Sequence, residues 1–259
     1  MIVTTAGRPT AKLISAALCV AEDLNITFIN RNKRSVKTIL EQFKEPVIVI
    51  GADRYEVYSS DSASPFFFHP NSSAFRLKRM EKGEIDPLIH AADLKKGDRF
   101  IDCTLGMASD AIIASHATGV EGEVTGIEKN NLVGYLVEKG LAEWKTENKS
   151  LEQAMRRIAV RNGDHLSFLQ GLPDRSVDVV YFDPMFSEEI KSSSGIAPLR
   201  LHADYSTDSL GQAIEEAKRA ARKRVVLKDH FRSLRFSEFG FTVLKRPSSK
   251  QHYGFIMLD

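Results

Sequence analysis

The sequence predicts an α/β protein with a mostly parallel sheet, and three observations support this fold class. From about residue 96, apolar runs of strand length alternate with segments of helical periodicity, as they do when helices connect parallel strands. Gly106 follows the first run and precedes a helical segment, which is the opening of a nucleotide-binding unit. Acids stand at the ends of four runs, namely Asp102, Glu128, Asp164 and Asp183. Because ligands of such sheets bind at the carboxyl ends of the strands, these acids mark the predicted functional edge.

The composition is that of a globular protein. The chain has 259 residues, of which 42% are hydrophobic and 27% charged, enough for one large domain or for a domain with a smaller companion. The net charge of +2 gives no sign of polyanion binding by the whole protein, so any nucleic-acid surface must be local. Cys19 and Cys103 lack metal-type spacing. We expect them to be buried free thiols in a reducing cytosol, and we expect no metal.

Residues 1–62 are predicted to form a small N-terminal α/β module. Its helices are expected at residues 10–24 and directly after Ser35, a residue type that often caps helices. Its strands are expected at residues 2–5, 26–29, 47–50 and 55–58. A polar, turn-rich stretch then indicates a boundary.

The first helix of this module resembles the start of a secretion signal, since Arg8 and Lys12 precede the apolar run 13–21. Acidic residues at 22 and 23 follow that run at once, which argues against a signal. Nor does any apolar run reach the length that spans a membrane. We therefore expect a cytoplasmic protein, and the sequence leaves its oligomeric state open.

A connecting segment is expected at residues 63–95 and the main domain at residues 96–259. Within the connecting segment, residues 66–80 are expected to be extended, and Asp86-Pro87 to start a helix, because proline is favoured at the first helical position. In the main domain the pattern predicts helices at 109–117, 131–141, 150–157 and 208–222, and strands at 100–104, 123–128, 158–162, 177–182, 223–228, 239–245 and 252–258.

The turn at Gly106 differs from that of a dinucleotide site. Dinucleotide sites carry three glycines, and the second lets the backbone approach a pyrophosphate. Here Leu105 and Met107 flank the single glycine of the turn. The turn therefore disfavours a nicotinamide oxidoreductase and is compatible with a nucleoside ligand that has no phosphate.

Glu128 lies 22 residues beyond Gly106 (128 − 106), the spacing at which an acid bonds ribose hydroxyls. Four acids at one edge suit a cationic ligand rich in hydroxyls, and S-adenosylmethionine (SAM) has a sulfonium, an amino group and a ribose diol. The alternative is that each acid caps the helix that follows it. Four such acids in regular order favour the ligand.

The segment Asp183-Pro184-Met185-Phe186 follows the most apolar predicted strand. Asp183 can accept from an exocyclic amine, while Phe186 can stack on a planar base. Pro184 stiffens the turn because its ring fixes φ, and its carbonyl could accept a second N–H. These three residues are the candidates for catalysis. The alternative is a tight turn with Phe186 in the core.

Five segments make the chain resemble class I, Rossmann-like SAM-dependent methyltransferases, and within them the bacterial family of ribosomal RNA small-subunit methyltransferase J. They are residues 102–111, 126–130, 162–164, 181–186 and 223–228. The resemblance implies a seven-stranded, mostly parallel sheet, SAM as cofactor and methylation of a guanine N2 in 16S ribosomal RNA. Beside Asp102 and Gly106, it puts at cofactor-binding positions Ser109, Asp110, Glu128, Lys129, Gly163, Asp164 and Asp183.

Methyl transfer to such an amine needs alignment more than a strong base, because the sulfonium methyl is already activated. Asp183 would hold the amine in a nucleophilic geometry and spread the developing positive charge. The base must be single-stranded or flipped out of its helix to reach the site.

Ribosomal RNA or the small ribosomal subunit is the expected partner. Arg76, Lys78 and Arg79 follow three phenylalanines and are the candidates for RNA contact; a second basic cluster spans residues 31–37. The alternative is that these charges are solvated and the rings belong to the core. Residues 187–205 could close over the target base or be a plain insertion.

Three further alternatives stay open. Lys228 either faces the substrate or reaches the surface. The methyl acceptor could be an amine of DNA or of a small molecule. The chain could also be a catalytically silent binding module, although acids at all four strand ends argue against it.

Overall fold

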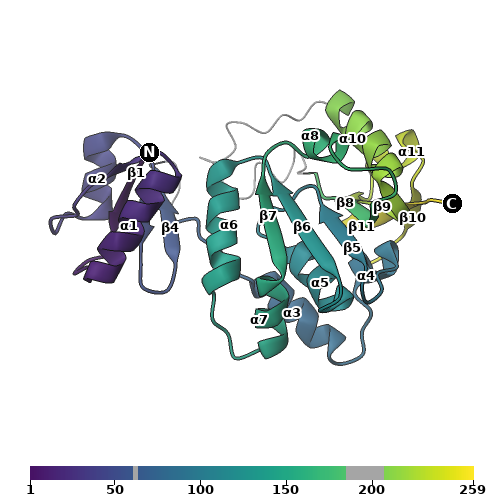
Figure 1. Ribbon diagram of the computed structural model, residues 1–259, viewed down its shortest axis with the longest axis horizontal. Coiled ribbons are helices and arrows are strands. Elements are labelled where there is room, and N and C mark those ends of the chain that lie inside the picture. Colours follow the sequence, from purple (N-terminus) through teal and green to yellow (C-terminus); the bar gives the residue numbers. More distant parts are fainter. Residues whose placement is uncertain (61–63, 185–206) are drawn as a thin grey trace. The chain divides into compact units, whose positions relative to one another are not determined.

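A computed structural model describes residues 1–60, 64–184 and 207–259 (Figure 1). These residues belong to two compact units, one covering Met1 to His69 and the other beginning at Pro70. These units reflect how closely the residues pack and do not by themselves define domains. The division into a module at 1–62, a connecting segment at 63–95 and a methyltransferase domain at 96–259 stays a prediction.

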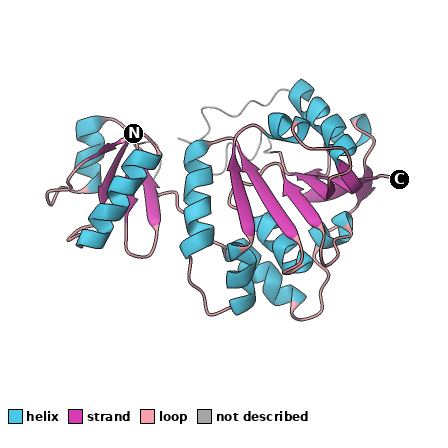
Figure 2. Cartoon of the chain, viewed as in Figure 1, coloured by secondary structure: helices cyan, strands magenta, loops and turns pink. Residues whose placement is uncertain are grey.

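The first unit contains a four-stranded sheet in the order β2-β1-β3-β4 (Figure 2). Strands β1 (Ile2–Thr5), β2 (Thr27–Phe28) and β3 (Val47–Ile50) are parallel, and β4 (Tyr55–Tyr58) is antiparallel. Helices α1 (Ala11–Asp23) and α2 (Val36–Phe43) complete the unit. Ser35 caps α2 as predicted, because its side chain accepts from the N–H of Thr38. Cys19, predicted to be buried, is exposed, whereas Cys103 of the second unit is buried.

The second unit contains the predicted seven-stranded sheet, in the order β10-β11-β9-β8-β5-β6-β7. Its strands are β5 (Arg99–Asp102), β6 (Glu123–Glu128), β7 (Ile158–Asn162), β8 (Val177–Phe182), β9 (Ala221–His230), β10 (Thr242–Leu244) and β11 (Gln251–Met257). Strand β11 pairs antiparallel with both β9 and β10, so it alone runs against the other strands of this sheet. The mostly parallel fold class is confirmed.

Helices pack on the two faces of this sheet. The described part of the second unit contains α3 (Asn71–Met80), which lies against α5, together with α4 (Pro87–Ala92), α5 (Ser109–Thr118), α6 (Asn131–Glu143), α7 (Lys149–Arg156), α8 (His165–Gln170), α10 (Thr207–Ala220) and α11 (Arg235–Glu238). Side chains alternate between the faces along each strand. Val180 and Phe182 of β8 pack in the core beneath α8 and α10, whereas Tyr181 points to α5. No helix in the described ranges is long and apolar enough to span a membrane.

The prediction that residues 66–80 are extended is wrong for most of this segment. Phe66 does pair with Val57 in an isolated bridge, but α3 begins at Asn71. Ser73 and Leu77 are buried one helical turn apart, so packing against the rest of the unit stabilises this helix. Helix α4 begins as predicted: Asp86 caps it and Pro87 is its first residue.

The strand order reverses at β5, which has β6 on one side and β8 on the other. Strands β5, β6, β7 and β8 are parallel, so their carboxyl ends lie along one edge. We call this edge the rim and define it by Asp102, Glu128, Asn162 and Phe182, the last residues of these strands. Ligands of open α/β sheets bind outside such an edge, where the strand order reverses.

Candidate active site

The predicted acids do meet at the rim. Asp102 pairs in register with Tyr181 of β8 and with Gly126 of β6. Glu128 ends β6, and Asp183 directly follows β8. Four acids far apart in the sequence, Asp164 included, are therefore positioned by the ends of adjacent parallel strands.

Glu128 and the Gly106 turn are in direct contact. One oxygen of Glu128 accepts from the N–H of Gly106 at 3.0 Å, and the other accepts from the N–H of Asn130 at 2.9 Å. Gly106 has a φ of 47° and Ala108 a φ of 58°, so the turn uses two left-handed residues. A Cβ at Gly126 would lie 2.3 Å from Leu105. Glycine at position 126 therefore lets the turn lie against β6.

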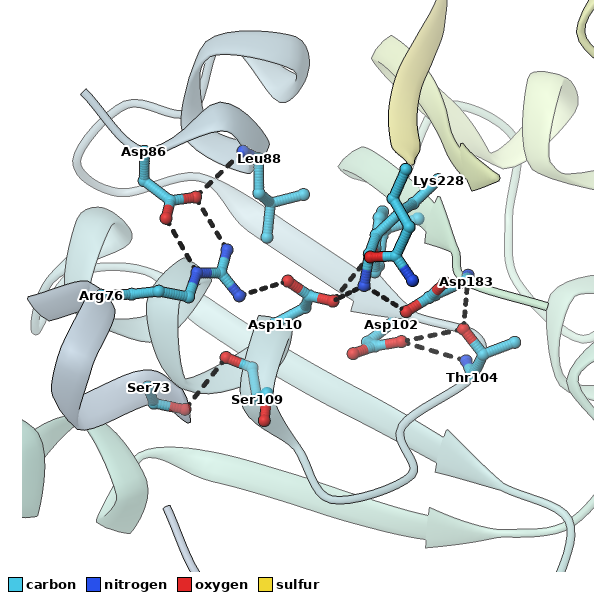
Figure 3. Close-up of polar contacts among 12 residues, drawn as sticks. Ser73, Arg76, Asp86, Leu88, Asp102, Thr104, Ser109, Asp110, Asp183 and Lys228 are labelled. Carbon is cyan, nitrogen blue, oxygen red and sulfur yellow. Dashed lines mark hydrogen bonds and ion pairs between the residues drawn. The ribbon is translucent and has the colours of Figure 1, made fainter. Parts of the chain in front are cut away.

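Asp183 is fixed through its main chain. Its N–H donates to the hydroxyl of Thr104 at 2.7 Å, and the N–H of Thr104 donates to Asp102 at 3.0 Å (Figure 3). Two hydrogen bonds thus connect the end of β8 to the end of β5.

The side chain of Asp183 belongs to a buried series of charges that we call the ionic chain: Asp183, Lys228, Asp110, Arg76 and Asp86 (Figure 3). Lys228 Nζ lies 2.5 Å from Asp183 and 3.2 Å from Asp110. Arg76 lies 2.5 Å from Asp110 and donates two hydrogen bonds to Asp86. Tyr181 adds a hydroxyl that donates to Asp110 at 2.8 Å. Strands β8 and β9 and helices α3, α4 and α5 are connected in this way.

The cations decide the charge of Asp110. Burial alone would raise the pKa of this carboxyl, but Lys228 and Arg76 outweigh burial and hold the pKa well below its ordinary range. Among the described residues, no cation lies at hydrogen-bond distance from Asp102. Burial, with a smaller contribution from Asp110, raises the pKa of Asp102 to about 8, which favours its protonated form. Burial also raises the pKa of Glu128.

The remaining cofactor candidates lie around these groups. Asp164 caps α8 by accepting from the N–H of Ser167 at 3.1 Å, so the capping alternative holds for this acid, and Lys129 lies 4.0 Å from it. The N–H of Gly163 donates to the carbonyl of Glu128. Ser109 begins α5, and its carbonyl accepts from the hydroxyl of Ser73 at 3.1 Å. Asp110 is turned into the ionic chain, where both oxygens accept from protein donors.

Two of the three catalytic candidates, Asp183 and Pro184, are described, and both are partly buried beside the rim. Phe186 and the stretch 187–205 lie outside the described residues. In the part of the chain that is described, no three His, Cys, Asp or Glu side chains gather as a metal site would need.

The surroundings of Arg76 argue against its predicted contact with RNA, which stays a prediction. Its side chain is 17% exposed and its guanidinium already pairs with Asp86 and Asp110. Arg79 is exposed but pairs with Glu84. Lys78 is exposed. The sequence pattern could not separate these three residues, because the acids that engage Arg76 stand 10 and 34 positions away.

Lys228 is the site residue whose role the sequence left undecided. Its side chain is 14% exposed, so it does not reach out to the surface. The sequence feature that could have indicated a buried Lys228 is the apolar run Val225–Leu227 directly before it. Tyr181, read as an apolar strand residue, is also a hydrogen-bond donor of the site.

Comparison with known proteins identifies the family. The model of a family described as "Putative SAM-dependent methyltransferase" matches residues 33–235. The chain belongs to this family of SAM-dependent methyltransferases. SAM is accordingly its cofactor.

The chain is also similar to curated proteins, some of which are named as methyltransferases. The methyltransferase is 50% identical to the uncharacterized protein YpiP of Bacillus subtilis. The match extends over 255 residues and covers 98% of each chain. It is 31% identical over 153 residues to ribosomal RNA small subunit methyltransferase J of Aeromonas hydrophila, covering 56% of this chain and 59% of the relative. The protein of the same name from Nitrosococcus oceani is 29% identical over 191 residues, covering 70% of this chain and 72% of its own length.

A solved structure supports the fold. The SAM-dependent methyltransferase NGO1261 of Neisseria gonorrhoeae matches 99% of this chain and 96% of its own, with a TM-score of 0.63 and 14% identity. The Rossmann-like methyltransferase fold is therefore confirmed.

We predict that Arg76→Met destabilises the protein far more than Arg79→Met does. Removing Arg76 leaves two buried carboxylates without their shared cation, which costs about 3–5 kcal/mol of unfolding free energy. Arg79 lies in solvent with Glu84, so its loss should change stability little. Denaturant unfolding of both variants measures the difference, and equal stabilities would contradict the buried role of Arg76.

We predict a pH-dependent stability difference between the wild-type protein and Asp102→Asn. Above its ordinary pKa of 3.8 the unfolded chain loses the Asp102 proton, whereas the native protein keeps it to about pH 8. The native state then binds more protons, so wild-type stability falls as pH rises between these values.

Asparagine does not titrate and keeps an oxygen for the N–H of Thr104. The variant should therefore gain on the wild type by up to about 1.4 kcal/mol per pH unit in this window. Unfolding curves at a series of pH values measure the gain, with Asp53→Asn at an exposed position as the control. Parallel curves for wild type and Asp102→Asn would show that Asp102 is ionised in the native protein.

Proposed function

We propose that this methyltransferase acts on an exocyclic amine of a base in ribosomal RNA, with guanine N2 as the target. The observation that carries the proposal is Asp183-Pro184 at the rim, where Asp183 is fixed by Thr104 at its main chain and by Lys228 at its side chain. The relatives named ribosomal RNA small subunit methyltransferase J support an RNA substrate. We expect the protein to act in the cytoplasm.

The donor set at the rim fits SAM. Glu128 would accept from the ribose hydroxyls, since its oxygens lie beside the Gly106 turn. Gly163, Asp164 and Lys129 would hold the adenosine end. The first turn of α5, which has no side-chain cap, offers N–H groups near Ser109 to the carboxylate of the cofactor. When bound, the cofactor supplies a methyl group activated by a sulfonium.

Asp183 would accept one N–H of the target amine and thereby orient its lone pair. Lys228 lies 2.5 Å away and favours the ionised form of Asp183, which makes it a good hydrogen-bond acceptor and a weak base. The Pro184 carbonyl would accept the second N–H. Phe186, beyond the described residues, would stack on the base as first predicted. Asp183, Pro184 and Phe186 are thus the proposed catalytic residues, and Lys228 is a positioning residue that acts through Asp183.

We predict that Glu128→Gln weakens SAM binding about ten- to a hundredfold, because it removes the charge that strengthens hydrogen bonds to hydroxyls. Titration calorimetry measures the affinity, and the melting temperature confirms that the variant is folded. Glu138→Gln changes the same chemistry at an exposed position of α6 and should bind SAM as the wild type does. An unchanged affinity in Glu128→Gln would reject the ribose assignment.

We predict that Asp183→Asn reduces methyl transfer at least about a hundredfold, the loss seen when one placed polar group of an active site is removed. The assay transfers labelled methyl groups from SAM to free 16S ribosomal RNA, small subunits, DNA and a metabolite pool, followed by nucleoside mass spectrometry. Asp174→Asn, at an exposed carboxylate, is the matched control.

The label should appear in ribosomal RNA on a guanine amine. Label found only in DNA or in metabolites would overturn the RNA substrate while leaving the methyltransferase assignment intact. A fully active Asp183→Asn would reject the role of Asp183.

A further inference from the structure

Strand β9 extends past the end of β8 at the rim. The last register pair between them joins Phe182 to Leu227, while β9 continues to His230, which pairs with Gln251 of β11. A strand rises about 3.3 Å per residue, so the loop after β9 begins about 10 Å beyond that pair. Lys228, in this extension, touches Asp183. The loop after β9 therefore stands on the substrate side of the rim.

Three rings gather at the start of this loop. The rings of His230 and Phe231 are 4.6 Å apart, and those of Phe231 and His252 are 5.9 Å apart. The Arg232 guanidinium lies 5.0 Å from the Phe231 ring. Phe231 is nevertheless 44% exposed, so it presents a flat apolar surface to solvent that its neighbours hold in place.

A second basic loop lies beside the rings. Strand β10 is parallel to β9, so the loop at residues 245–250, between β10 and β11, is at the same edge. The N–H of Phe231 donates to the carbonyl of Lys250, which joins the two loops. Arg232, Lys245 and Lys250 are exposed. From residue 229 to 252 the chain has five Lys or Arg residues and two acids, Asp229 and Glu238, and Asp229 pairs with Arg235.

We propose that these two loops bind single-stranded RNA next to the target base. We call the surface the β9–β11 patch and define it by Phe231, Arg232, Lys245, Lys250 and His252. Exposed rings stack on unpaired bases, and cations that pair with no acid of the described residues, as here, bind the phosphates between them. A duplex hides its bases, so the ring favours a single strand. This inference rests on the proposed function. It puts the RNA contact at the β9–β11 patch and not at Arg76 and Arg79, whose guanidinium groups are engaged by acids.

The test measures binding of the full-length protein to a fluorescent single-stranded RNA of about ten nucleotides, a length that one such surface covers. Phe231→Leu keeps apolar volume but removes the ring, and should weaken binding about tenfold. Phe75→Leu is the matched control, because Phe75 is also exposed (65%) and lies in the basic segment that the sequence first suggested.

A triple change of Arg232, Lys245 and Lys250 to Gln should weaken binding and reduce the slope of log affinity against log salt by about 2, as expected for three phosphate contacts on a single strand. The control variant changes Lys95, Lys96 and Lys145 to Gln and so removes the same charge. These three lysines are exposed and lie outside the patch. SAM calorimetry on every variant tests the cofactor site separately, so a failure of the patch is distinguishable from a failure of the methyltransferase assignment.

The expected result is weaker RNA binding in both patch variants, with SAM affinity and both controls unchanged. Unchanged RNA binding in Phe231→Leu and in the triple variant would overturn the proposal. Loss of RNA binding in Phe75→Leu alone would also overturn it. So would a polyglutamate peptide that binds as tightly as the RNA and equally well to Phe231→Leu, since the patch would then bind an acidic protein.

Discussion

Arg76 and Lys228 are the two cations on which the candidate site depends, because three carboxylates lie beside them with little access to water. A buried charge is tolerated when it is paired and hydrogen-bonded, and Asp110 meets this condition with Arg76, Lys228 and Tyr181. The same contacts fix where α3, α5 and β9 lie relative to one another. The geometry around Asp183 therefore also depends on the packing of α3, a helix that carries none of the methyltransferase segments.

The charge of the rim is smaller than its acids suggest. Burial raises the pKa of Asp102 to about 8, and Asp183 shares Lys228 with Asp110. Asp164 keeps its charge and caps α8. The sequence argument that four acids attract a cation is weakened accordingly. What the rim offers instead is a set of placed acceptors, of which Glu128 is already oriented by two backbone N–H groups.

Local patterns predicted the parts of the fold that depend on nearby residues. The strand ends at Asp102 and Glu128, the Gly106 turn and the caps at Ser35 and Asp86 all follow from periodicity and turn chemistry. Helix α3 did not, because its stability comes from packing and its first residues follow three phenylalanines and a proline. The ionic chain was also hidden, since its contacts join residues up to 118 positions apart. Sequence thus located the acids but not the cations that decide what each acid can do.

The path of the ionic chain sets the smallest piece of this protein that keeps the site intact. A fragment beginning at Lys96, near the first recognisable motif, lacks Arg76 and Asp86. In the described structure, Asp110 pairs with two cations, Arg76 and Lys228. This fragment loses Arg76, and Lys228 is shared with Asp183. A fragment beginning at Pro70, the start of the second compact unit, retains both. Boundaries for expression or fusion of this domain are therefore set by a buried charge rather than by the motifs.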